Sequence, residues 1–297
     1  MKLMKSTGGN VNRKHFLQGL GVLILIFSLG GCATTPYQGD GKTRSDTLLQ
    51  QQFQAADKAL TAQSGGGIIF AGFSLHSQSR AFRNDVVTAE KAVRSIDPSA
   101  IVFKLDNPTL GQAHDWPYAT AENLAAVLAK VGALARPQDK VVVLVSTHGN
   151  VNALGINFSN QNYPHINARM LNESLAGLRG KPVLLLLSAC HSGSFVQALS
   201  GPTRVILTAA ASDRSSFGCQ FHSTNTYFID ALLNQHDLLD RSLTQLMDAA
   251  KADIQKREQA QKLSPPSSPQ IFVGAAAKEW ANQALKNWLT PGQRQTP

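Results

Sequence analysis

Apolar runs of strand length alternate along the chain with segments that carry apolar residues at helical spacing. Two runs in the middle of the chain, at 141–145 and 183–187, are wholly apolar. A run that is apolar on both faces is typical of a strand buried on both sides, as in a parallel sheet. Further strands are expected at 68–73, 100–105, 205–208 and 271–274.

The segments between these runs have the pattern of amphipathic helices. In 79–95, apolar residues recur at spacings of three and four, while Thr120 and Asn167 are residue types that cap helix N-termini. Other helices are expected at 48–63, 226–233, 241–261 and 276–289, and the Asn/Gly-rich segment 151–163 is expected to form a hairpin. Strands that alternate with helices predict an α/β fold with a mostly parallel central sheet and helices on both faces.

The first 31 residues differ in character from the rest. Four basic residues and no acids precede an apolar stretch at 16–29, which is short for a membrane span. Cys32 follows two glycines, a pattern that resembles a bacterial lipobox and implies cleavage before Cys32 and lipid on that residue. The alternative is an uncleaved N-terminal anchor. Ala33 resembles the sorting position of outer-membrane lipoproteins, so we expect a cell-envelope lipoprotein that faces the periplasm.

The predicted organisation is a signal peptide over 1–31, a lipidated cysteine with tether and short helix over 32–64, one α/β domain over 65–290, and a disordered tail over 291–297. A length of 297 residues allows one large α/β domain or two small ones. The content of 43% hydrophobic and 16% charged residues is that of a folded protein.

Charge adds little to this interpretation. The formal net charge is +9, and part of it belongs to the predicted signal peptide. The remaining positive charges are scattered, and no basic run indicates a nucleic-acid groove. We therefore expect no nucleic-acid partner, and expect membrane contact only through the lipid anchor.

Candidate chemistry follows the two central strands. His148 and Cys190 come shortly after these strands, and side chains past the carboxyl ends of parallel strands share one crevice. A thiol beside an imidazole is a nucleophile with its base. The amides of Gly149 and Cys190 can then hold the oxyanion of an acyl-transfer reaction.

Three alternatives compete with this interpretation. His148, Cys190 and His191 can ligate zinc, but no Cys-x-x-Cys or His-x-x-x-His pair supports a metal site, and no cofactor is expected. A nucleophile elbow would place a later histidine beside Cys190, and His222 and His236 are available, yet the flanking glycines of an elbow are missing. A Cys190–Cys219 disulfide would remove the nucleophile.

Several motifs resemble one family when taken in order along the chain. They are Thr120-Ala121-Glu122-Asn123-Leu124, Ser146-Thr147-His148-Gly149, Ser188-Ala189-Cys190-His191-Ser192-Gly193, residues 208–219 with their Ser-Ser-Phe-Gly-Cys end, Thr226-Tyr227-Phe228, and residues 269–274. Together these motifs resemble the peptidase C13 family, the legumain-like cysteine peptidases of clan CD, and most closely its bacterial lipoprotein members. The resemblance covers roughly residues 66–285.

The resemblance implies a caspase-like three-layer fold and a Cys190–His148 dyad that needs no third acid. It also implies a pocket for the side chain before the cut bond, lined by Arg80 or Arg83, Ser215, Asp230 and the residue at 188. The family has an acid at that last position, and here it is Ser188, which puts a preference for Asn in doubt. The family has a cysteine at 219 as well, so the resemblance favours a packed thiol over a disulfide there.

The function that follows is a cysteine endopeptidase acting on a peptide or protein substrate through an acyl-enzyme. A non-catalytic lipoprotein that binds peptides or scaffolds partners in the same crevice is the alternative from another class. A transpeptidase, in which an amine replaces water at the acyl-enzyme, shares the first step.

Overall fold

The structure is a computed structural model that describes residues 40–63, 65–108, 114–158 and 161–289. The predicted signal peptide, Cys32 and the predicted disordered tail lie outside the described residues. In the described ranges, no helix combines the length and the apolar character that crossing a membrane requires.

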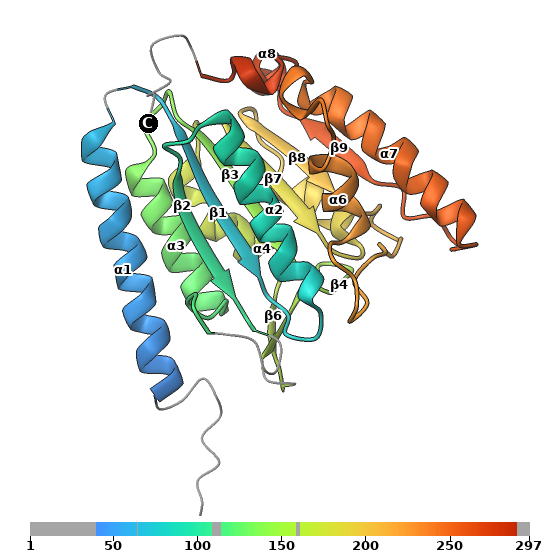
Figure 1. The fold of residues 1–297 in the computed structure, drawn as a ribbon, viewed down its shortest axis with the longest axis horizontal. Helices are drawn as coiled ribbons and strands as arrows, with labels where there is room; N and C mark the ends of the chain where they lie inside the picture. Colours follow the sequence, from blue (N-terminus) through green and yellow to red (C-terminus); the bar gives the residue numbers. More distant parts are fainter. Residues whose placement is uncertain (1–39, 64, 109–113, 159–160, 290–297) are drawn as a thin grey trace, which may run out of the picture. The chain divides into compact units, whose positions relative to one another are not determined.

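A six-stranded sheet forms the centre of the fold, in the order β2-β1-β3-β7-β8-β9 (Figure 1). Its strands are β1 (Ile68–Ser74), β2 (Ile101–Asp106), β3 (Lys140–Ser146), β7 (Val183–Ser188), β8 (Arg204–Thr208) and β9 (Gln270–Val273). All neighbouring pairs are parallel except β8 and β9, which are antiparallel. The prediction of a mostly parallel sheet is therefore confirmed.

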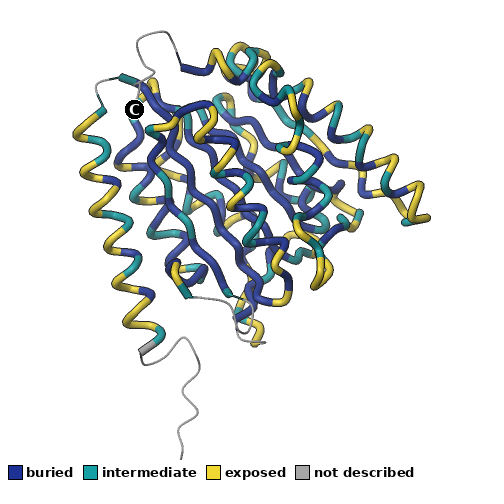
Figure 2. The backbone as a smooth tube through the Cα atoms, viewed as in Figure 1, coloured by how far each residue is buried: buried dark blue, intermediate teal, exposed yellow. Residues whose placement is uncertain are grey.

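Helices cover both faces of this sheet. One face carries α2 (Arg80–Ile96), α6 (Tyr227–Leu233) and α7 (Leu243–Ala260), and the other carries α3 (Ala121–Leu134), α4 (Ala168–Ser174) and α5 (Val196–Leu199). Side chains of β3 and β7 alternate between the two cores, so the central strands are buried on both sides (Figure 2). The three-layer α/β arrangement is confirmed, and apolar burial on both faces is its main driving force.

The first described helix, α1 (Asp40–Ala62), lies beside the edge strand β2 and packs on α3 (Figure 1). The side-chain amide of Gln52 donates to the Lys104 carbonyl at 2.9 Å and accepts from the Lys104 amide at 3.0 Å. Gln52 thus replaces a strand partner at this edge, which protects the edge from pairing with another chain.

Helix boundaries agree with several sequence predictions and correct others. Thr120 and Asn167 cap α3 and α4, because their side chains accept from the amides three residues later. The helix expected at 48–63 begins earlier, at Asp40, where Arg44 donates to the His114 carbonyl and Ser45 accepts from the Tyr118 amide.

The hairpin expected at 151–163 is confirmed: β5 (Ala153–Phe158) and β6 (Gln161–Ile166) pair antiparallel, and β4 (Gly149–Asn150) extends them to a three-stranded sheet. The single helix expected at 276–289 is wrong. That segment is broken into a turn at Ala275–Ala277, the short α8 (Lys278–Ala281) and a turn at Leu285–Asn287. Between α8 and the turn at Leu285–Asn287 the backbone leaves the helical region at Ala284, with ψ 141°, so the two do not join into one helix.

A buried carboxylate on α2 joins the ends of the two central strands. Asp85 is fully buried, and it accepts hydrogen bonds from Ser146 Oγ at 2.6 Å, from Ser188 Oγ at 3.3 Å, and from Thr226 Oγ1 at 2.8 Å. The Thr226 amide at 3.0 Å and Asn225 Nδ2 at 3.1 Å complete its shell. We call these five residues the Asp85 cluster. Burial raises the pKa of Asp85 to about 6, and the hydrogen bonds from its neighbours oppose that rise.

We predict that Asp85→Ala lowers the free energy of unfolding by about 3 kcal/mol or more, because it leaves several buried donors without an acceptor. Asp57→Ala is the matched control: its carboxylate is exposed and pairs with Lys130, so its loss costs about 1 kcal/mol or less. Urea denaturation at pH 7 measures both. Equal losses in the two variants would contradict the role given to the Asp85 cluster.

Candidate active site

Three neighbouring parallel strands end in the same way. Their last residues are serines that lie in register: Ser74 of β1 pairs with Ser146 of β3, and Ser146 pairs with Ser188 of β7. The second residue after each serine is His76, His148 and Cys190, respectively. The register therefore brings the loops that carry His148 and Cys190 together at one edge of the sheet, with His76 in the corresponding position beside them.

The thiol of Cys190 lies half-buried against the loop at 214–218. The Ser216 amide donates to Cys190 Sγ at 3.2 Å, and Ser216 Oγ lies 3.6 Å from the same sulfur. The Cys190 loop is anchored there, because the His191 amide donates to the Arg214 carbonyl at 2.8 Å. The Ser216 backbone therefore contacts the sulfur directly, and the carbonyl of the same residue lies 3.6 Å from it.

The ring of His148 is held by other rings. The His76 ring lies perpendicular to it with a centroid distance of 4.5 Å, and the Phe82 ring is nearly perpendicular at 5.0 Å. No group among the described residues forms a hydrogen bond to this imidazole. Burial lowers the pKa of His148 below its ordinary value, which favours the neutral ring that accepts a proton.

Gly149 brings the His148 loop against the Cys190 loop. A Cβ on Gly149 would lie 2.4 Å from the Cys190 carbonyl oxygen, so only glycine fits. The pair Asn150–Ala153 closes the turn, and the Gly155 amide donates to the His148 carbonyl at 2.8 Å. In an antiparallel ladder, hydrogen-bonded pairs alternate with pairs that are not hydrogen-bonded. His148–Gly155 is a hydrogen-bonded pair, so the next pair, Gly149–Leu154, is not, and the Gly149 N–H points away from β5. The Cys190 amide donates to no group in the described part of the chain.

The two arginines named as alternatives for the pocket lie in different surroundings. Arg83 pairs with Asp106 and Asp115, both at 2.7 Å, and stacks on Trp116. Arg80 is exposed at the start of α2, and the described residues form no ion pair with it. The preceding residue, Ser79, donates to the Gln220 carbonyl, so the start of α2 touches the loop that follows Ser216.

The other predicted pocket residues are also separated by their contacts. Ser215 is exposed beside Ser216, the residue that contacts the thiol. Ser188 is buried, and its hydroxyl lies within hydrogen-bond distance of Asp85 and Thr226. Asp230 forms an ion pair with Arg257 at 2.6 Å, and the same arginine pairs with Asp253 at 2.6 Å.

The structure also bears on the alternatives. Cys190 and Cys219 are both free thiols, and burial raises the pKa of Cys219. Over the described ranges, no set of three or more His, Cys, Asp or Glu residues is arranged to hold a metal ion. His191 Nδ1 lies 3.2 Å from the Ser212 carbonyl oxygen, while His222 and His236 are exposed.

Sequence reasoning missed three residues of this region. Asp85 carried a signal, because an acid stood on the apolar face of the segment 79–95. His76 also carried one, since Ser-x-His recurs at the ends of two predicted strands. Ser216 gave no signal of its contact with the sulfur, because that contact depends on how the loop returns to Cys190.

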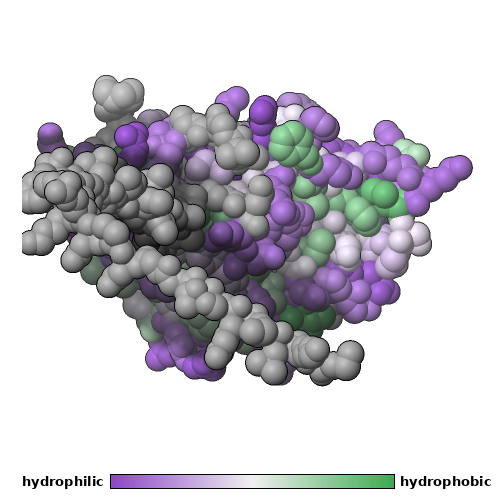
Figure 3. Space-filling view, turned by 90° about the horizontal axis from the view of Figure 1, so that it is seen from below, coloured by the Kyte–Doolittle hydropathy of each residue, from purple (hydrophilic) through white to green (hydrophobic). Residues whose placement is uncertain are grey.

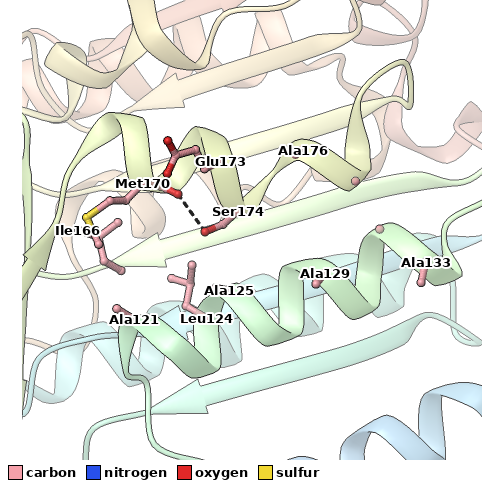
Figure 4. Close-up of a pocket in the computed structure, with 12 residues that line it drawn as sticks. Ala121, Leu124, Ala125, Ala129, Ala133, Ile166, Met170, Glu173, Ser174 and Ala176 are labelled. Atoms are coloured by element: carbon pink, nitrogen blue, oxygen red, sulfur yellow. Dashed lines mark hydrogen bonds between the residues drawn. The ribbon is translucent and has the colours of Figure 1, made fainter.

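A groove in another part of the fold is not lined by His148 or Cys190. This groove of about 740 Å³ runs between α3 and α4, with a floor of alanines such as Ala125 and Ala129 (Figure 4). Its labelled side chains include one titratable group, Glu173 (Figure 4). In the view from below, the coloured part of the surface shows hydrophilic areas with separate apolar patches (Figure 3).

The sheet order and the helices on both of its faces define a three-layer α/β protein. The model of the peptidase C13 family matches residues 119–274, more than half of the chain, and the chain belongs to this family. No curated protein matches the chain. Among solved structures, it is similar to a crystal structure of caspase-1 from Spodoptera frugiperda, with 16% identity, a TM-score of 0.47, and coverage of 71% of this chain and 86% of that one. A likeness of this size carries no information on activity.

Proposed function

We propose that the protein is an endopeptidase in which Cys190 is the nucleophile and His148 the base. The observation that carries this proposal is the register of β3 and β7, which ends both strands at paired serines two residues before His148 and Cys190. Family membership supports the reaction type, because it indicates a cysteine peptidase.

The reaction begins when His148 takes the thiol proton and the Cys190 sulfur attacks the carbonyl carbon of the scissile bond. The new C–S bond places negative charge on the carbonyl oxygen, which the Gly149 and Cys190 amides bind. One such donor is worth about 3–4 kcal/mol in the transition state. The C–N bond then breaks, His148 gives its proton to the leaving amine, and water hydrolyses the thioester.

The test is cleavage of a peptide library by the full-length protein. Cys190→Ala and His148→Ala are each expected to lower the rate at least about 10³-fold, because nucleophile and base act as a unit. Cys219→Ser is the matched control and keeps the activity. Cleavage that survives Cys190→Ala would exclude the proposal. Peptide binding without turnover would favour the scaffold, and capture of an added amine would favour a transpeptidase.

We propose further that Arg80 selects an acidic side chain before the cut bond. Arg83 forms ion pairs with two carboxylates, and Asp230 forms an ion pair with Arg257. Arg80 is then a positive charge beside the loop at 216–220 that forms no ion pair with a described carboxylate. An unpaired guanidinium binds a carboxylate in preference to an amide.

Arg80→Ala is expected to lower kcat/KM for peptides with Asp at that position about 10–100-fold, the worth of one charged hydrogen bond. Peptides with Ala there should be nearly unaffected. Arg83→Ala is the control, since it should reduce stability and leave the preference between peptides unchanged. A preference for Asp that is the same in Arg80→Ala as in wild type would contradict the assignment.

We propose that Cys32 carries lipid and anchors the protein in the cell envelope, at an outer membrane and facing the periplasm. The support is sequence alone: the basic start, the apolar stretch and the two glycines before Cys32. Cys32→Ser is expected to move the protein from the membrane fraction to the soluble fraction. Unchanged fractionation, together with an unchanged mass at the N-terminus, would contradict lipidation.

A further inference from the structure

A third chemically active side chain stands in the row formed by His148 and Cys190. β1, β3 and β7 are neighbours in the sheet, and Ser74, Ser146 and Ser188 align across them. His76 therefore follows the end of β1 as His148 follows the end of β3. The order of strands places the His76 loop on the side of His148 away from Cys190.

The backbone around His76 is fixed by β5. The Asn157 amide donates to the Leu75 carbonyl at 3.0 Å, and the Ser77 amide donates to the Asn157 carbonyl at 3.2 Å. His76 is 7% exposed, and its ring packs edge to face against two others. The distance between ring centroids is 4.5 Å to His148 and 6.0 Å to Phe82. With Phe82 also against His148, the three rings form a closed triangle.

These three rings fix the orientation of the His148 ring, which in other nucleophile–base pairs is fixed by a hydrogen bond. The base of such a pair is usually oriented by a third group. Here no described residue hydrogen-bonds the His148 ring, so its orientation depends on packing against His76 and Phe82. Rings packed edge to face hold one relative geometry in preference to others.

A second histidine beside the base is tolerated because it stays neutral. Burial, and secondarily the neighbouring His148, lowers the pKa of His76 to about 4. His76 Nδ1 accepts from the Gln78 amide at 3.4 Å, which assigns the proton of the neutral ring to Nε2. At neutral pH, His76 therefore does not repel a protonated His148.

We infer that His76 is a positioning residue that holds the His148 imidazole in the orientation needed to accept the proton of Cys190. This inference rests on the proposed function, because it assigns His76 a role in the same reaction. His76 touches the base and not the substrate, so its loss should act on kcat and leave KM unchanged.

The experiment compares His76→Ala, His76→Phe and wild type in the full-length protein. His76→Ala is expected to lower kcat about 100-fold, the effect of a misplaced catalytic group. His76→Phe keeps a ring in the triangle and should restore most of the loss. The rate of Cys190 alkylation by iodoacetamide is the second readout, since it needs no peptide substrate and should fall and recover in the same order.

The pH profile separates positioning from a general loss of structure. His148 must be neutral to accept a proton, and its pKa is held down by burial, so activity falls as the pH drops through that pKa. His76→Ala admits water, raises the pKa of His148 toward its usual value, and moves the acid limb to higher pH. His76→Phe leaves the limb in place. Among the described titratable groups, His76 from the β1 loop faces the His148 ring, and Cys190 lies on the neighbouring β7 loop. Cys190 is unchanged in the comparison.

His114→Ala is the matched control, because His114 is a partly buried histidine stacked on Tyr118 at 3.8 Å in another part of the fold. It should lose comparable stability and keep wild-type kcat and alkylation. A His76→Ala protein with wild-type kcat, alkylation rate and acid limb would overturn the inference. Wild-type protein that turns over no peptide while His76→Ala still slows alkylation would reject the peptidase and retain the positioning role.

Discussion

The arrangement of the site depends on one buried carboxylate and the donors that surround it. Asp85 reaches from α2 to the last residues of β3 and β7 and to Thr226 at the start of α6. Each donor faces away from water, so each needs this acceptor, and the carboxylate needs them. Because the serines at 146 and 188 are held at one point, the loops that follow them leave the sheet side by side.

The sheet order explains why His76, His148 and Cys190 follow the ends of three neighbouring strands. Parallel strands in register deliver their next residues to one edge, and the sheet order places the β1, β3 and β7 loops in a row. Gly149 permits the close approach of its loop to Cys190, where a Cβ would meet the Cys190 carbonyl. The Ser216 amide then faces the sulfur from the opposite loop. The contact to the sulfur therefore comes from a residue 26 positions away in the sequence.

Much of the fold could be predicted from the chain because buried strands and amphipathic helices have strong periodic patterns. The strands at 141–145 and 183–187 and the caps at Thr120 and Asn167 are examples. The prediction of one helix over 276–289 is wrong because the backbone leaves the helical region at Ala284, and no feature of the sequence pattern marks that residue. Position 188 shows the limit for the site: sequence assigned Ser188 to a pocket, whereas its hydroxyl faces Asp85, a contact made across 103 positions. The burial of a single polar group and its partners far away in the sequence depend on tertiary packing. The periodic pattern of apolar residues therefore does not predict them.

The central claim is that the two loops meet so that an imidazole activates the Cys190 sulfur. Competitive labelling of the full-length protein with iodoacetamide at pH 6 tests it most directly, with Cys219 as the internal reference. Burial raises the pKa of Cys219, so its labelling should be slow at this pH. The account predicts that Cys190 is labelled much faster than Cys219 and that His148→Ala removes the difference. Equal labelling of the two thiols in wild type, or a Cys190 advantage that survives His148→Ala, would contradict it.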